Sequence, residues 1–414
     1  MKAVFEKSRL SGIVKAPPSK SAAHRLIISA ALAGGVSEIR GVEYSEDILA
    51  TLDCAEALGA KIVRGDDFVV IDGREFLSVD AGADGKLVLN CRESGSTLRF
   101  FIPLAMLTGV CVEFLGSERL MARPLGVYEK LARENSIEFD KKDGCITILG
   151  KLPNKELQVD GGVSSQFITG LMFALVRLGG GSAIHVIPPF ESRPYVEMTV
   201  GTLRQFGARI EFSGNDIIID EGQSLHTWSG DVEGDFSNAA FLDAYNLIGG
   251  DVTVTGLPAN SAQGDAAYRA FFHRLKNGTP TIDLSDTPDL APILIALAAC
   301  LHGATFTGTH RLAAKESDRG AVMAEELRKF GVQITVGEDT ITVPRCGVLH
   351  APTSPIAKHN DHRIVMALST LLTLTGGEIH GCEDVKKSFP SYFDTIKKLG
   401  ARFTLMPDER TETI

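Results

Sequence analysis

The chain has 414 residues, of which 44% are hydrophobic and 23% charged, and its formal net charge at pH 7 is −10. That length suffices for roughly two to three domains with full-sized cores, and the composition is that of an ordinary globular protein. The acidic net charge argues against a dedicated nucleic-acid-binding protein, which normally carries a basic excess. We therefore expect small-molecule rather than nucleic-acid partners.

The seven cysteines form no Cys-x-x-Cys pair, so the sequence predicts neither a disulfide framework nor a zinc site. Residues 1–6 lack the apolar core of a signal peptide. The longest apolar runs fall well short of the roughly 18 residues that a membrane span needs. We expect a cytoplasmic protein with free thiols, no membrane segment and no metal.

A helix with a polar start and a glycine stop recurs six times along the chain. The first begins in residues 17–25, Pro-Pro-Ser-Lys-Ser-Ala-Ala-His-Arg, and stops at Gly34-Gly35. Serine before an apolar run is first of all a helix N-cap. Lys20 and Arg25 beside the free N–H groups also make this helix start a candidate seat for phosphate or carboxylate. The other five starts are residues 93–97, 164–166, 235–238, 286–289 and 360–363, with stops at Gly109, Gly179, Gly249, Gly303 and Gly376.

A short strand is predicted after each glycine stop, for example in residues 110–114, 251–255 and 304–307. A second, amphipathic helix then leads into a β-hairpin. The clearest second helices are residues 52–60, 200–208, 323–332 and 393–401, each closed by a glycine, and weaker copies follow Tyr128 and Tyr268. After the second of these, a Ser-Gly-Asn turn joins strands at residues 210–212 and 217–220.

The repeat of roughly 70 residues predicts an α/β fold of six similar units, grouped as three plus three. The boundary is expected near residues 230–234, and residues 1–15 are expected to lend a strand to either domain. Equivalent ends of repeated units tend to face the same way. We therefore expect the helix starts of both domains to face a common, anion-attracting cleft.

Further charged and polar side chains follow the predicted strands at corresponding positions: Arg123, Ser192, Tyr195, Lys315, Glu316, Arg319 and Lys387. Each has a simpler alternative. Arg123-Pro124 also fits an ordinary turn before a helix, and residues 315–319 also fit a solvated helix start. Asp289 could be a first-turn residue that interacts with the helix dipole, and His24 and His362 could be buried core residues. The chain has no P-loop, Gly-x-Ser-x-Gly elbow or metal-ligand cluster. Arginines, lysines and the carboxylates of Asp289 and Glu316 suit metal-free acid–base chemistry on anionic substrates.

Four motifs in this order and spacing resemble the enolpyruvyl transferase family over nearly the whole chain: Pro18-Ser19-Lys20-Ser21 with Arg25, Ser164-Ser165-Gln166-Phe167, residues 311–319 with their Lys-Glu-Ser-Asp-Arg end, and Asn360-Asp361-His362-Arg363. The resemblance implies two similar α/β domains, residues 16–233 and residues 1–15 plus 234–414. Each domain would hold three βαβαββ repeats around a pseudo-threefold axis, an inside-out α/β barrel. The active site would lie in the cleft between the domains, which would close over substrate about hinges near Ala16 and Gly234.

The reaction that the resemblance implies is transfer of the enolpyruvyl group of phosphoenolpyruvate to the 5-hydroxyl of shikimate 3-phosphate, by addition and elimination, in a monomer without metal or cofactor. By motif, the proton-transfer residues correspond to Asp289, Glu316 and Lys20. The shikimate 3-phosphate ligands correspond to Lys20, Ser21, Arg25, Ser164, Ser165, Gln166, Ser192, Tyr195, Asp289 and Lys315. The phosphoenolpyruvate ligands correspond to Lys20, Gly95, Arg123, Gln166, Arg319, Arg363 and Lys387.

The chain departs from the family pattern at Glu93 and Arg311, which stand where asparagine is usual. A carboxylate at position 93 would repel phosphoenolpyruvate unless Arg123 or Arg99 compensates. One alternative is the sibling enzyme that transfers the same group to a UDP-sugar, but that enzyme uses a loop cysteine and residues 116–123 hold none. The other is a non-catalytic phosphometabolite-binding protein, which loss of Lys20, Asp289 or Glu316 would have favoured.

Overall fold

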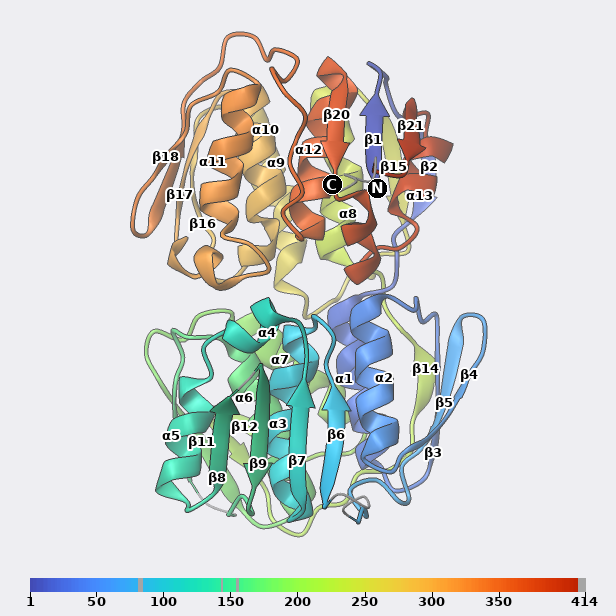
Figure 1. Ribbon diagram of the computed structural model, residues 1–414, viewed down its shortest axis with the longest axis vertical. Coiled ribbons are helices and arrows are strands. Elements are labelled where there is room, and N and C mark those ends of the chain that lie inside the picture. The colour runs from blue at the N-terminus through green and yellow to red at the C-terminus, as the bar shows by residue number, and fades with distance from the viewer. Residues whose placement is uncertain (81–84, 143, 154–155, 409–414) are drawn as a thin grey trace, which may run out of the picture. The chain divides into compact units, whose positions relative to one another are not determined.

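The computed structural model describes residues 1–80, 85–142, 144–153 and 156–408. The chain divides into two compact units, Pro18–Glu233 and Met1–Pro17 with Gly234–Ile414 (Figure 1). Each unit has a hydrophobic core of its own. The chain therefore passes from one unit to the other twice, directly before Pro18 and directly after Glu233.

Three long helices, one from each repeat, form the interior of the unit Pro18–Glu233. They are buried over almost their whole length because their sequences are apolar on all sides. In the described residues they are α1 (Lys20–Leu32), α3 (Gly95–Thr108) and α6 (Ser165–Leu178). The remaining helices of this unit are α2 (Glu46–Ala57), α4 (Glu118–Ala122), α5 (Gly126–Glu134) and α7 (Arg193–Gln205).

Sheets of one design cover these helices. In each, an outer strand runs parallel to the next strand, which continues into an antiparallel hairpin. The described strand orders are β14 (Ser229–Asp231), β3 (Val36–Arg40), β5 (Phe68–Asp72), β4 (Lys61–Arg64); β6 (Lys86–Asn90), β7 (Cys111–Leu115), β9 (Cys145–Leu149), β8 (Glu138–Lys142); and β10 (Leu157–Asp160), β11 (Ser182–Ile187), β13 (Asp216–Ile219), β12 (Ile210–Ser213). Because β14, the last strand of the unit, pairs with β3 of the first repeat, it closes the set of three repeats.

The unit that contains residues 234–408 has three corresponding internal helices in its described residues, α8 (Phe236–Asp243), α10 (Ala291–Cys300) and α12 (His362–Thr375). Its outer helices in the described residues are α9 (Tyr268–Asn277), α11 (Arg319–Lys329) and α13 (Tyr392–Lys398). Short 3₁₀ turns stand between these elements: η1 (Ala244–Ile248), η2 (Gly264–Ala267), η3 (Pro288–Leu290), η4 (His310–Ala314) and η5 (Cys382–Lys387).

The N-terminal segment completes two sheets of this second unit. Strand β1 (Lys2–Phe5) lies between β20 (Gly377–His380) and β21 (Phe403–Met406), and β2 (Ser11–Lys15) pairs with β15 (Asp251–Thr255) (Figure 1). The third sheet has the order β16 (Thr281–Asp283), β17 (Ala304–Thr307), β19 (Thr340–Val343), β18 (Thr335–Val336). The prediction of a hairpin in every repeat is therefore wrong for the fourth and sixth repeats. In the fourth, the described strand β15 pairs with β2, and in the sixth, β20 and β21 pair with β1.

Most predicted helix starts and stops are confirmed, with shifts that have local causes. Gly109, Gly179 and Gly249 end their helices at φ values of +74°, +75° and +96°. Helix α2 begins at Glu46 rather than residue 52, because the Ser45 side chain caps it by accepting a bond from the amide of Ile48. No helix in the described residues is long and apolar enough to cross a membrane.

Candidate active site

Helix α1 begins as predicted, with Ser19 as its cap. The Ser19 hydroxyl accepts a hydrogen bond from the amide of Ala22 at 3.3 Å. The Nζ of Lys20, the first helical residue, lies 2.7 Å from Oδ2 of Asp47 in α2. Both side chains are largely buried, at 14% and 11% exposure. The amine is thus held over the helix start by a carboxylate that an incoming anion would have to compete with.

Arg25, one turn into α1, ties this helix to α7. Its guanidinium donates to Oγ1 of Thr199 at 2.8 Å, to the carbonyl of Tyr195 at 2.9 Å and to the carbonyl of Ser21 at 2.7 Å. Burial lowers the pKa of Arg25 to about 10. Three of its five N–H donors are therefore engaged within the unit. The structure thus links the predicted ligands Ser21, Arg25 and Tyr195.

The start of α3 is packed against a guanidinium. Ser94 caps the helix by accepting from the amide of Thr97 at 3.2 Å, and Gly95 is the first helical residue. A Cβ placed on Gly95 would lie 2.5 Å from Nη1 of Arg123. The positive end of a helix and an arginine at one point attract an anion strongly. Gly95 and Arg123, both predicted phosphoenolpyruvate ligands, are therefore adjacent.

Gln166 joins the starts of α3 and α6. Its side-chain oxygen accepts from Nη1 of Arg99 at 2.6 Å, and its amide nitrogen donates to Oγ of Ser96 at 2.9 Å. Ser164 caps α6 by accepting from the backbone amide of Gln166 at 3.3 Å, and the next residue, Ser165, is buried. The serine pair and the glutamine thus stand at one helix start, beside the start of α3.

Ser192 occupies the cap position of α7 in a left-handed conformation, with φ at +53°. This region is uncommon for a residue with a side chain. Ser192 is buried, and Tyr195 follows it in the first turn of α7. The two predicted ligands therefore share the turn that Arg25 fastens to α1.

In the other unit, the guanidinium of Arg319 connects three carboxylates. The fully buried Arg319 donates from Nη1 to Asp289 at 2.8 Å, from Nη2 to Glu316 at 2.8 Å and from Nε to Asp361 at 2.9 Å. Burial would lower the pKa of Arg319, but the three carboxylates raise it. One buried cation thereby brings together Asp289 and Glu316, the two predicted proton-transfer carboxylates.

Asp289 has two further cationic partners, Lys315 at 3.2 Å and Arg363 at 3.0 Å. Burial would raise the pKa of Asp289, but Arg363, Lys315 and Arg319 hold it well below its ordinary value. Burial lowers the pKa of Lys315, an effect that Asp289 opposes. Asp289 is therefore a carboxylate, and not a carboxylic acid, at neutral pH.

The remaining predicted cations, Arg363 and Lys387, lie at the start of α12 and at the end of η5. Asp361 caps this helix by accepting from the amide of Arg363 at 3.0 Å, and Nη1 of Arg363 donates to Oγ of Ser237 at 2.6 Å. Lys387, at the end of η5, donates from Nζ to the carbonyl of Asn360 at 2.6 Å. The cations of α12 and η5 thus lie around the residues that open α12.

The comparisons with known proteins agree over nearly the whole chain. A family model described as EPSP synthase (3-phosphoshikimate 1-carboxyvinyltransferase) matches residues 4–396. A 3-phosphoshikimate 1-carboxyvinyltransferase of Clostridium kluyveri is 38% identical over 418 residues, covering 95% of this chain and 96% of that protein. The chain belongs to the EPSP synthase family. A relative of the same name from Clostridium novyi is 36% identical over 425 residues, covering 95% of this chain and 96% of the relative.

The fold of the EPSP synthase family is seen in a solved structure. An EPSP synthase from Acinetobacter baumannii superposes with a TM-score of 0.78 at 24% sequence identity, covering 98% of this chain and 99% of that chain. Together with the repeated sheets, this likeness confirms the predicted α/β fold of two similar three-repeat domains.

Sequence reasoning missed several residues that hold the predicted ligands in place. Asp47 pairs with Lys20, Ser237 with Arg363, and Asp361 with Arg319. Asp361 lies in the Asn-Asp-His-Arg motif, so the motif marked its position but not its partner. Asp47 carried no such signal, because it reads as an ordinary acidic residue in the first turn of a helix.

The two departures from the family pattern have different surroundings. Glu93 is exposed and lies two residues before Gly95, so its charge remains in contact with solvent near the start of α3. Arg311 lies in η4 and donates to the backbone carbonyl of Ser285. The arginine is thus turned toward the loop before η3, which carries Asp289.

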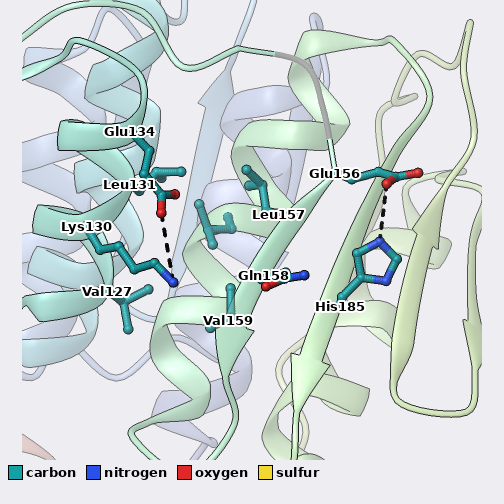
Figure 2. A pocket seen from close by; sticks show the side chains of 10 residues that line it. Val127, Lys130, Leu131, Glu134, Glu156, Leu157, Gln158, Val159 and His185 are labelled. Carbon is teal, nitrogen blue, oxygen red and sulfur yellow. Dashed lines mark ion pairs between the residues drawn. The ribbon is translucent and has the colours of Figure 1, made fainter.

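A separate pocket of about 440 Å³ opens between α5 and the outer strand β10 (Figure 2). Val127, Leu131 and Leu157 line its apolar part, and His185 lies near its rim with Nε2 3.7 Å from Glu156. None of the residues that line this pocket is a predicted substrate ligand. Within the described residues, no group of three or more His, Cys, Asp and Glu side chains is placed to hold a metal ion.

Proposed function

We propose that this protein transfers the enolpyruvyl group of phosphoenolpyruvate to the 5-hydroxyl of shikimate 3-phosphate, with release of phosphate. Membership of the EPSP synthase family and the names of full-length relatives support this reaction. The structural observation that carries the proposal is the buried guanidinium of Arg319, which is bonded to both Asp289 and Glu316. Two carboxylates on one cation suit paired proton transfers beside anionic groups.

The proposed ligands of shikimate 3-phosphate are those at the starts of α1, α6 and α7, together with Asp289 and Lys315. Hydroxyl, amide and cationic donors around helix N-termini are suited to a phosphate and to sugar-like hydroxyls. The proposed residues are Lys20, Ser21, Arg25, Ser164, Ser165, Gln166, Ser192, Tyr195, Asp289 and Lys315.

The proposed ligands of phosphoenolpyruvate are mostly cations, because this substrate carries both a phosphate and a carboxylate. Arg123 against the start of α3 supports this assignment, since its position there favours an anion between the two. The proposed residues are Lys20, Gly95, Arg123, Gln166, Arg319, Arg363 and Lys387.

The reaction requires two proton transfers in the addition step and one in the elimination step. In the addition, the 5-hydroxyl oxygen bonds to C2 of phosphoenolpyruvate, its proton passes to a carboxylate, and C3 receives a proton. In the elimination, C3 returns a proton and the phosphate leaves with its bonding electrons. We assign these transfers to Asp289, Glu316 and Lys20. When substrate anions draw Lys315 and Arg363 away from Asp289, the pKa of Asp289 rises, which makes it a better base.

The proposed ligands come from both units, so the proposal requires both units to act on one pair of substrates. The inter-domain active site and domain closure therefore stay predictions, as do a cytoplasmic location and a monomeric state. All seven cysteines are free, which supports a reducing compartment.

The direct test is phosphate release by the purified full-length chain. We expect release when shikimate 3-phosphate and phosphoenolpyruvate are both present, and none with either alone. Release with a UDP-sugar acceptor but not with shikimate 3-phosphate would assign the chain to the sibling reaction. Glu316→Gln should lower turnover by about 10²–10⁴ with little change in substrate binding. The matched control is Glu325→Gln, an exposed residue of α11.

A further inference from the structure

Helix α11 carries a second buried charge, Glu326, whose side chain is 0% exposed. Oε1 of Glu326 lies 2.7 Å from Nε2 of His359 and accepts from the amide of Ala357 at 3.3 Å. Oε2 lies 2.8 Å from Nζ of Lys329. Burial would raise the pKa of Glu326, but the bonds from His359 and Lys329 lower it. A buried, ionised carboxylate with this many partners is costly to break.

Two of the partners of Glu326, Ala357 and His359, belong to residues 350–361, which we call the strap. The strap lies along α11 in the opposite direction. At its first end, the amides of His350 and Thr353 donate to the carbonyls of Phe330 at 3.2 Å and Lys329 at 3.0 Å. Next, Nζ of Lys329 donates to the carbonyl of Pro355 at 2.9 Å, and Ala357 and His359 bond to Glu326. At its last residue, Arg319 pairs with Asp361 at 2.9 Å.

The strap ends at the residues that open α12. Asn360 is in a left-handed conformation, with φ at +55°, and its carbonyl accepts from Lys387. Asp361 is the cap of α12, and Arg363 follows in the first turn. Asparagine is one of the few side-chain-bearing residues that adopt this conformation readily, so Asn360 suits the turn between the strap and α12. The bond from His359 to Glu326 is the anchor directly before this residue.

Arg319 and Glu326 are seven residues apart, which puts them on one face of α11, two turns from each other. Arg319 pairs with Asp361 of the strap, and Glu326 pairs with His359. Ile356 is also paired with β20, and Lys358 with Glu383 at 2.6 Å, so loss of the Glu326 anchor would release chiefly residues 359–360, directly before Asp361. The carbonyl that orients Lys387 and the turn that carries Arg363 would then shift together.

We propose that Glu326, acting through His359, is a positioning residue for the phosphoenolpyruvate cations Arg363 and Lys387. This inference rests on the proposed function, which assigns those cations to phosphoenolpyruvate. Most proposed shikimate 3-phosphate ligands lie in the unit Pro18–Glu233 and have no bond to the strap in the described contacts. The proposal therefore requires an effect on one substrate and not on the other.

The test compares His359→Leu, Glu326→Leu and the double variant, with Glu325→Gln as the control and His359→Gln as the conservative variant, because glutamine retains an N–H donor. We expect the two leucine variants to raise KM for phosphoenolpyruvate about tenfold, with KM for shikimate 3-phosphate within about twofold of wild type. The double variant should be no worse than the worse single variant, because both remove one link. His359→Gln should restore most of the affinity.

Calorimetric binding of phosphoenolpyruvate, in the presence of shikimate 3-phosphate, separates the two proposals. A wild-type chain that binds phosphoenolpyruvate but releases no phosphate would overturn the proposed function, and the variants' affinities would still decide the role of Glu326. Equal changes in both KM values, or a lower melting temperature with unchanged KM values, would reduce Glu326 to a structural role. If Glu326→Leu does not fold, His359→Leu and His359→Gln provide the same comparison.

Discussion

Replacement of Arg319 by methionine is the sharpest test of how the buried charges support the site. Methionine is unbranched and apolar, so it fills much of the space without a charge. The change removes the bonds from the guanidinium to Asp289, Glu316 and Asp361. Asp289 and Glu316 are partly exposed, at 21% and 23%, but Asp361 is 0% exposed. The loss of the Asp361 ion pair therefore determines how far the free energy of unfolding falls.

After the change, Asp361 would keep the Ser317 hydroxyl at 2.9 Å and the amide of Arg363 at 3.0 Å, but no bonded cation among the contacts described. Breaking a buried ion pair by removal of one partner costs about 3–5 kcal/mol. The two remaining hydrogen bonds compensate only in part, so we expect the free energy of unfolding to fall by about 3 kcal/mol or more. Removal of the exposed Arg328 should cost less than about 0.5 kcal/mol.

Hydrogen exchange of α11 and α12, read by mass spectrometry, measures this loss in the unit concerned, because exchange reports the local free energy of opening. Trp228, the single tryptophan, belongs to the other unit. Its fluorescence therefore serves as a control that the other unit remains folded. Arg319→Met combined with Asp361→Asn should recover part of the loss, since the fully buried carboxylate at position 361 is then neutral. A loss below about 1 kcal/mol, or no recovery in the double variant, would refute the reasoning.

Three further predictions follow from the site. Gly95→Ala should raise KM for phosphoenolpyruvate without loss of stability, because the added Cβ displaces only the far end of the long Arg123 side chain. An unchanged KM would contradict the assignment of Gly95 and Arg123 to phosphoenolpyruvate. The lowered pKa of Asp289 stabilises the folded state above the pKa of the unfolded chain, and this stabilisation is lost as pH falls through the folded pKa. The free energy of unfolding of Asp289→Asn, measured between pH 7 and pH 3, should therefore fall less with decreasing pH than that of wild type. Parallel profiles of the two proteins would count against a lowered pKa of Asp289. Thr51→Val should cost about 1–3 kcal/mol in denaturant unfolding, because it removes the buried bonds of the Thr51 hydroxyl to His24 and to Thr97, both at 2.7 Å, and a neutral change would exclude this pair of bonds as stabilising contacts.

The sequence by itself determined the features that depend on nearby residues. Ser19, Ser94 and Ser164 were predicted to begin helices, and each caps one through its side chain. The glycine stops at Gly109 and Gly179 were likewise correct. Such features are legible because a cap or a left-handed glycine acts on backbone groups within one turn. The six-fold repetition of these local signals was enough to predict the α/β fold.

Only the tertiary structure decided the contacts between distant residues. Strand β1 pairs with β20, although their sequences are more than 370 residues apart. Lys20 meets Asp47, and Arg319 meets both Asp289 and Asp361, at separations that no local pattern records. Strand pairing and buried ion pairs are settled by packing of the whole unit, which decides which polar groups lose water together. The sequence therefore predicted where the charges stand along the chain, and the fold decided which of them meet.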